Sequence, residues 1–260
     1  YKQAIKLDPD FALAHAGVGR VCALIYEWRE QKPEWIERGI AACERALAVD
    51  PDLAEVLAAR ARMFYAEENF EKSIAYAQKA LERKPDCEGA YDTLLRSLFA
   101  SDQFAVVHKL MDAALEANGD DYNVYIPLLN AMGRLGDQEA LHKLRQRQSQ
   151  ALLHQLDLVP EDVRARILLA SNHADEGRAS DAIRQLETAV ALAPSDSSVL
   201  YNAACTYAVL GRKTEAIEMI RKTMIASYRR LELFTRDPDL AIIQEDPEFK
   251  RILAQHAHSY

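Results

Sequence analysis

A pattern of small and apolar residues occurs twice in succession between Val163 and Met224. Four positions of the first copy return 34 residues later in the second: Ala170 as Ala204, Gly177 as Gly211, Ala182 as Ala216, and Ile183 as Ile217. A fixed period of this length, with glycine between two helical stretches, predicts a stack of two-helix units. Each unit in such a stack buries its apolar face against its neighbours, so we expect an all-α solenoid.

The ends of the second helices are marked by residues that stop helices. Proline cannot continue a helix, and it disfavours helical backbone at the residue before it. The residues expected to end the second helices are Pro9, Pro51, Pro85, Gly119, Pro160 and Pro194. Gly119 is expected to adopt a left-handed backbone conformation that ends its helix. We therefore expect an array over residues 1–227, made of a partial repeat 1–11 and the repeats 12–53, 54–87, 88–121, 122–162, 163–196 and 197–227. A start inside a repeat predicts a longer parent chain.

Two of these repeats are enlarged. The first has an insertion around Tyr26 to Trp35, where Trp28 and Trp35 form either a partner-binding knob or a cover over the neighbouring repeat. The second is enlarged within residues 137–160, where we expect one helix to run longer. Pro127 lies inside a predicted first helix, so that helix either starts late or kinks.

Residues 228–260 depart from the repeat pattern and are expected to form a C-terminal cap. Two Asp-Pro pairs occur here, each at a plausible helix start, with Asp as the cap and Pro in the first turn. The last repeat of a solenoid needs such a cover because no further repeat buries its face. The apolar residues expected to lie on the array are Leu240, Ile242, Ile243, Phe249, Ile252 and Leu253.

Residues 12–227 resemble tetratricopeptide repeats in their period, their small-residue positions and their proline punctuation. The resemblance implies a right-handed superhelix of antiparallel helix pairs whose first helices line a concave groove. The stretch LYNAACTYAVLGRKTEAIEMIRK and the following DPDLAIIQEDPEFKRILA resemble the C-terminal tails of large bacterial signalling proteins. In those proteins an adenylate cyclase, a serine/threonine kinase or a winged-helix regulator lies upstream, which implies a docking or regulatory role here.

Composition narrows the class of protein further. The formal net charge of −8 argues against a nucleic-acid binder, which needs a broad basic surface. The four cysteines form no CxxC pair, which favours reduced thiols and a cytoplasmic location. No apolar run is long enough to predict a membrane-inserted helix, although a longer parent chain could be membrane-anchored.

The groove candidates follow from register on the first helices. The residue after the small crossing position is arginine in three successive repeats, and the proposed contacts are Arg20, Arg62, Arg96, Asn130, Tyr201 and Asn202. Three guanidinium groups in register predict binding of an acidic peptide or of a chain terminus, because they hold carboxylates in bidentate pairs. The alternative is that each arginine pairs with a nearby carboxylate such as Glu27 or Glu55.

Catalysis has no support in the sequence. The seven histidines are scattered over separate units, and no HExxH, glycine-rich phosphate loop or GxSxG motif occurs. We therefore predict a protein that is not an enzyme and has no metal, catalytic residue or cofactor.

The favoured function is a protein–protein interaction scaffold that binds a peptide segment of its partner in the concave groove. The alternative is a regulatory tail that acts in cis on a signalling enzyme such as a cyclase or kinase. Self-association is a further expectation, because Tyr1, Ala4, Ile5 and Leu7 form an uncovered apolar face.

Overall fold

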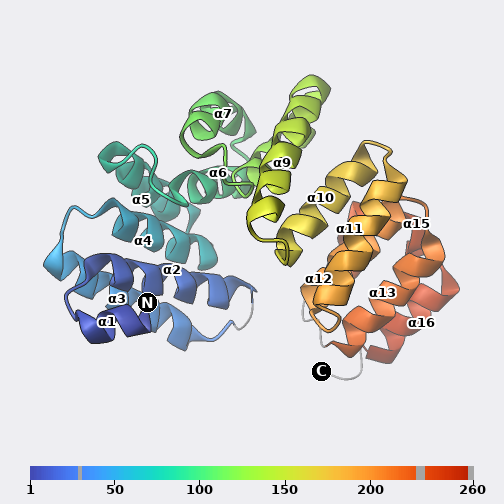
Figure 1. Cartoon of the computed structure of the whole chain (residues 1–260), viewed down its shortest axis with the longest axis horizontal. Coiled ribbons are helices and arrows are strands. Elements are labelled where there is room, and N and C mark those ends of the chain that lie inside the picture. Colours follow the sequence, from blue (N-terminus) through green and yellow to red (C-terminus); the bar gives the residue numbers. More distant parts are fainter. Residues whose placement is uncertain (29–30, 227–231, 257–260) are drawn as a thin grey trace. The chain divides into compact units, whose positions relative to one another are not determined.

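The structure is a computed structural model that describes residues 1–28, 31–226 and 232–256 (Figure 1). This described part of the chain is built from helices and contains no strand, which confirms the all-α solenoid class. The chain divides into two compact units, Tyr1–Arg145 and Gln146–Tyr260. The repeat boundaries expected from the sequence, and that of the cap, stay predictions.

Unit 1 contains α1 (Lys2–Leu7), α2 (Ala12–Trp28), α3 (Pro33–Val49), α4 (Ala54–Ala66), α5 (Phe70–Arg83), α6 (Ala90–Ala100), α7 (Phe104–Asn118) and α8 (Tyr125–Leu135). Helix α9 (Gln138–Leu158) contains the division between the units. Unit 2 contains α10 (Val163–Asp175), α11 (Ala179–Leu192), α12 (Ser197–Val209), α13 (Lys213–Ile225), α14 (Glu232–Arg236), the 3₁₀ turn η1 (Pro238–Leu240), α15 (Ala241–Gln244) and α16 (Pro247–His256).

Helices cross closely where their residues are small. The alanines at the crossings are fully buried: Ala46, Ala61, Ala80, Ala114, Ala170, Ala189 and Ala204. At Gly19, where α2 packs on α3, an added Cβ would lie 2.6 Å from Cys43 Sγ and 3.4 Å from the Gly39 carbonyl oxygen. Glycine is required at this crossing because no larger side chain leaves room for α3.

The turn between the two helices of a repeat uses one backbone position in the left-handed region. Five residues at equivalent turn positions have φ between 57° and 75°: Glu68, Asp102, Gly136, Gly177 and Gly211. The backbone N–H of the residue after this position then donates to a carbonyl oxygen of the first helix. After Gly211, for example, the Arg212 N–H donates to the Tyr207 carbonyl oxygen at 2.9 Å. Glycine adopts this conformation without strain, whereas glutamate and aspartate do not.

A buried chain of hydroxyl groups joins α4, α5 and α6. Ser73 and Ser97 are both fully buried, and their Oγ atoms lie 2.7 Å apart. Ser73 Oγ also donates to the Ala61 carbonyl oxygen at 2.8 Å, and Ser97 Oγ donates to the Thr93 carbonyl oxygen at 2.8 Å. Each buried hydroxyl thus has a partner, which removes the cost of taking it out of water.

Two expectations about helix ends concern the middle of the chain. Helix α8 starts late, at Tyr125, so that Pro127 lies in its first turn, where backbone N–H groups have no partner within the helix. The expected left-handed stop at Gly119 is wrong, because this residue has φ −64° and ψ −16°. The Tyr125 hydroxyl donates to the Gly119 carbonyl oxygen at 2.9 Å, and an added Cβ would overlap the Leu115 carbonyl oxygen.

The two enlarged repeats lengthen their helices. Helix α9 has 21 residues, which confirms the expectation of one longer helix within residues 137–160. In the first enlarged repeat, α2 and α3 have 17 residues each, and Pro33 is the first residue of α3. The Arg38 guanidinium lies 5.6 Å from the ring centre of half-buried Trp35. The side chain of Trp28 lies outside the described residues.

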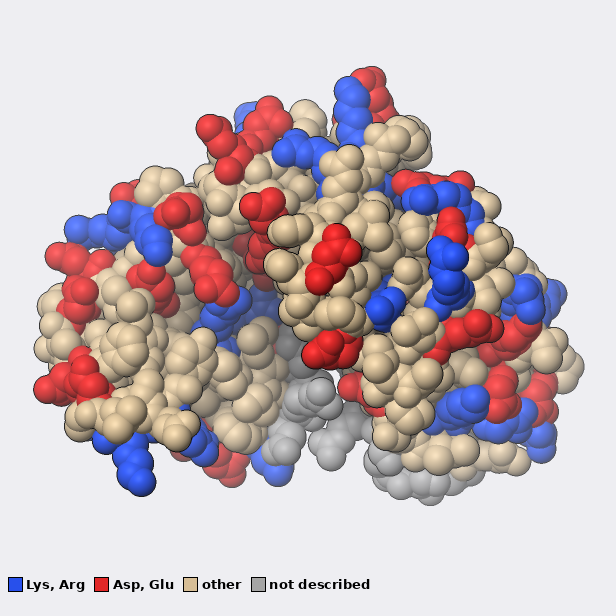
Figure 2. Space-filling view, in the orientation of Figure 1, with Lys and Arg blue, Asp and Glu red and all other residues tan. Residues whose placement is uncertain are grey.

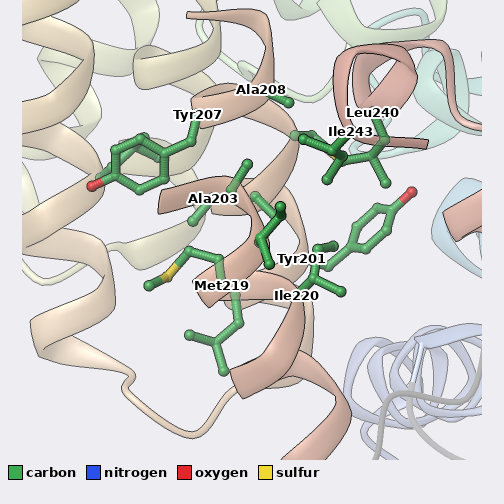
Figure 3. Close-up of a cluster of buried hydrophobic side chains, with 14 of the residues drawn as sticks. Tyr201, Ala203, Tyr207, Ala208, Met219, Ile220, Leu240 and Ile243 are labelled. Carbon is green, nitrogen blue, oxygen red and sulfur yellow. The ribbon is translucent and has the colours of Figure 1, made fainter. Parts of the chain in front are cut away.

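In unit 2, the C-terminal helices cover the α12–α13 pair, as the sequence predicted (Figure 3). Leu240, Ile243, Phe249 and Ile252 are at most 2% exposed and join the same apolar cluster as Tyr201. Both Asp-Pro pairs start helices: Asp237 caps η1, and Asp246 Oδ1 accepts the Glu248 N–H at 2.9 Å. Ile242 was expected on the array, but it is 39% exposed, whereas Leu253 is half-buried against the cluster.

Candidate functional site

The first helices of three successive repeats, α2, α4 and α6, pack side by side in unit 1. Their surface is called here the first-helix face. Each helix contributes one of the predicted arginines: Arg20 from α2, Arg62 from α4 and Arg96 from α6. The register inferred from the sequence thus gives one arginine on each of three adjacent helices.

Arg62 lies at the centre of a buried charge network. Its side chain is 7% exposed, and its two terminal nitrogens contact carboxylates of the two flanking helices. Nη1 donates to Asp92 Oδ2 of α6 at 2.9 Å, and Nη2 lies 2.7 Å from Glu27 Oε2 of α2. The guanidinium also lies 5.3 Å from the ring centre of Tyr65. Removing Arg62 would leave the Glu27 carboxylate, which is 16% exposed, without this cation, at a cost of up to about 3–5 kcal/mol.

Arg96 joins this network through the Nε side of its guanidinium group. Its Nε donates to Asp92 Oδ1 at 2.7 Å, and its side chain is 12% exposed. Burial lowers the pKa of Arg96, but the Asp92 carboxylate outweighs it and gives a net rise. Among the described residues, the two Nη groups have no hydrogen-bond partner, and they are not sealed from solvent as the unpartnered Arg62 Nε is. A guanidinium with a free Nη edge is able to take a carboxylate from outside the chain.

Arg20 lies apart from that network, near the start of α6. Its Nη1 donates to Glu88 Oε1 at 2.5 Å, with the two side chains 38% and 76% exposed. An exposed pair of this kind is worth about 0–1 kcal/mol, so a ligand is able to displace it. Of the carboxylates considered as internal partners, Glu27 pairs with Arg62, whereas Glu55 pairs with Lys84.

The other predicted contacts lie in different surroundings. Asn130 is exposed on α8, and Asn202 is exposed on α12, where its Nδ2 donates to the Ser198 carbonyl oxygen at 2.7 Å. Tyr201 is 5% exposed, and its hydroxyl donates to Asp237 Oδ2 at 2.6 Å. Its ring packs edge-on against Phe234 at 5.3 Å. The structure therefore groups Arg62 and Arg96 with Asp92 within unit 1, whereas Tyr201 and Asn202 belong to α12 of unit 2.

A thiol and two carboxylates meet at the start of the C-terminal segment. Ligand atoms of Cys205, Asp237 and Asp239 lie within 4.8 Å of one another. Both Asp237 oxygens are already used, one by the Tyr201 hydroxyl and the other by the Asp239 N–H of the cap. Burial and the neighbouring Asp237 and Asp175 raise the pKa of Asp239 to about 6. Sequence reasoning missed this group, because only the Asp-Pro cap pointed to Asp237.

Buried thiols in this protein are held in their neutral form. Burial raises the pKa of Cys43 to about 12 and that of Cys87 to about 11. The Cys205 thiol also has a raised pKa, first through burial and then through the charge of Asp237. A neutral thiol is a poor nucleophile, so none of these three is activated for covalent catalysis.

A sequence model described as tetratricopeptide repeat matches residues 36–86 and 167–227. The chain is therefore a helical repeat protein, and these two stretches of it are similar to tetratricopeptide repeats. Across the described helices, none is long and apolar enough to cross a membrane. Figure 2 shows basic and acidic side chains interspersed over the face in view.

Three solved structures are similar to this chain in fold. PilF of Pseudomonas aeruginosa is 15% identical with a TM-score of 0.51, over 93% of this chain and 98% of that one. A tetratricopeptide repeat protein from Parabacteroides merdae is 13% identical with a TM-score of 0.53, over 98% and 89%. The Cut9–Hcn1 hetero-tetramer of APC/C is 12% identical with a TM-score of 0.53, over 94% of this chain and 54% of that one. At these identities the likeness concerns the fold alone.

Proposed function

We propose that this protein is a protein–protein interaction scaffold that holds a peptide segment of its partner against the first-helix face of unit 1. The tetratricopeptide fold supports an interaction scaffold in general terms. The observation that carries the finer proposal is the free Nη edge of Arg96, fixed in place by Asp92. A half-buried cation that is already oriented loses little freedom when it binds a carboxylate.

The three arginines have different roles in this proposal. Arg96 contacts a carboxylate of the peptide, either an acidic side chain or the chain terminus. Arg62 is a positioning residue, because both of its terminal nitrogens are engaged by Glu27 and Asp92, and the contact with Asp92 fixes that carboxylate beside Arg96. Arg20 supplies a second contact once it leaves Glu88. Exposed Asn130 on α8 lies on the next first helix and extends the same surface.

The test is a screen of wild-type protein against an array of short synthetic peptides, repeated with Arg96→Gln and with Arg96→Lys. We expect Arg96→Gln to lose a set of peptides rich in Asp and Glu or ending in a free carboxylate. Arg96→Lys keeps the charge but lacks the bidentate fork, so it should recover binding in part. Lys109→Gln is the matched control, because Lys109 is exposed on α7, away from the first-helix face. Identical peptide profiles for wild-type protein and Arg96→Gln would refute the proposed site.

A further inference from the structure

A second cationic cluster lies on α4 and α5, around the rings of Phe64 and Tyr76. The ring centroids are 5.1 Å apart. Arg60 lies over both rings, at 5.4 Å from Phe64 and 6.0 Å from Tyr76. Lys72 Nζ lies 5.4 Å from the Phe64 centroid, and Lys79 Nζ lies 5.6 Å from the Tyr76 centroid. These five residues are called here the cation–ring patch.

The cations of this patch have no carboxylate partner in the described part of the chain. Elsewhere in unit 1, cations such as Arg83 and Lys84 form ion pairs with carboxylates. Arg60, Lys72 and Lys79 contact rings instead, and none of them forms an ion pair within residues 1–28, 31–226 and 232–256. Three like charges without an ion pair to any described residue are notable in a chain whose formal net charge is −8.

The patch is distinct from the first-helix face. Arg60 and Arg62 are two residues apart on α4, and residues with this spacing point to different sides of a helix. Lys72, Tyr76 and Lys79 follow one another at helical spacing along α5, which is a second helix of its repeat. The patch thus offers a surface that the site at Arg96 does not use.

We propose that the cation–ring patch binds an acidic segment of a partner protein through a row of carboxylates. The charge of the patch is complementary to such a segment. The rings hold the three cations in place from one side, which leaves their other sides open to anions. Lys72 and Lys79 are exposed, so an incoming chain reaches their ammonium groups directly.

The spread of the cations favours a row of carboxylates over a single phosphate. Lys72 and Lys79 are seven residues apart, or about 10 Å along α5, and each lies over a different ring. An extended peptide advances about 3.3 Å per residue, so acidic residues three positions apart match the spacing.

The experiment uses a fluorescein-labelled synthetic peptide with aspartate at every third position, titrated with the full chain at low ionic strength. Fluorescence anisotropy should give a Kd that rises about tenfold for Arg60→Gln/Lys72→Gln/Lys79→Gln. The charge-matched control is Lys6→Gln/Arg45→Gln/Lys109→Gln, whose exposed residues lie on three different helices. Since Lys72 and Lys79 are exposed, Lys72→Gln/Lys79→Gln repeats the test without touching half-buried Arg60.

Three outcomes would overturn the proposal. The first is an equal loss of binding in the patch variant and the charge-matched control, which would mean that only net charge matters. The second is displacement of the peptide by inorganic phosphate at an ionic strength where sodium chloride has no effect, which would mean a single-anion site. The third is loss of binding in Arg96→Gln alone, which would place the acidic peptide on the first-helix face. Binding that Arg96→Gln leaves unchanged and the patch variant weakens supports the proposal, whatever the peptide array shows for Arg96.

Discussion

Replacing Glu68 by glycine should stabilise unit 1, because Glu68 has a left-handed backbone with φ 59° in the turn between α4 and α5. That conformation costs a non-glycine residue about 1–2 kcal/mol. Glycine removes this cost, but its greater conformational freedom stabilises the unfolded chain by about 0.4–1 kcal/mol. The difference is a stabilisation of about 0.5–1 kcal/mol. The converse change, Gly211→Ala, should cost a similar amount, since an added Cβ there has no neighbour within 4 Å.

Urea unfolding followed by circular dichroism measures both changes as shifts of the transition midpoint. Glu68→Ala is the matched control, because it removes the same carboxylate and keeps the left-handed strain. The reasoning is refuted if Glu68→Ala stabilises the protein as much as Glu68→Gly, because the gain would then come from lost charge repulsion beside Glu67. Asp102, with φ 57°, should give a smaller gain with glycine, since aspartate tolerates this region better.

Three further predictions concern a carboxylate, a thiol and a hydroxyl group. The pKa of Asp239 is raised from 3.8 to about 6, so the folded protein binds more protons than the unfolded chain between these values, and its stability falls as pH rises through them. Asp239→Asn should therefore raise the melting temperature above pH 6, with a gain that vanishes below 3.8; a constant gain would contradict this. Cys43, whose pKa is raised to about 12, should react with a thiol reagent only after urea unfolds the protein. Ser73→Ala removes a donor from the buried hydroxyl chain and should lower the free energy of unfolding by about 1–3 kcal/mol, measured by urea titration.

The sequence predicted the features that depend on local pattern. The repeat period predicted the order of the helices. The small residues that recur with this period, such as Ala170 and Ala204, are fully buried. The Asp-Pro pairs gave both cap positions, at Asp237 and Asp246. These features are predictable because each depends on backbone conformation or side-chain size within a few residues.

Features that depend on packing between repeats were not predictable to the same degree. The register of Arg62 and Arg96 could be read from the sequence, but their partner Asp92 lies on another helix from Arg62, 30 residues away. The conformation of Gly119 was not predicted correctly. The Gly119 carbonyl oxygen accepts a hydrogen bond from the Tyr125 hydroxyl, and the local sequence pattern does not indicate this contact. Nothing in local spacing shows whether an arginine at a given register has a free edge.

Two expectations stay predictions. The likeness of the last helices to the tails of bacterial signalling proteins concerns domains that lie outside this chain. Self-association through Tyr1, Ala4, Ile5 and Leu7 involves α1, which has no buried residue. Light scattering on a chain extended by one upstream repeat would test it, and a dimer that disappears would show that only the uncovered face associates.

The charge network around Arg62 has a consequence for how unit 1 comes apart. In a repeat array each unit contacts only its neighbours, so repeats are able to fray one at a time from an end. Here one guanidinium is shared by α2, α4 and α6, so α2 cannot leave without separating Glu27 from the buried guanidinium on α4. We expect amide hydrogens of these three helices to exchange in a single cooperative step, while α1 opens earlier. A binding surface formed by these three helices would therefore be folded before the partner binds.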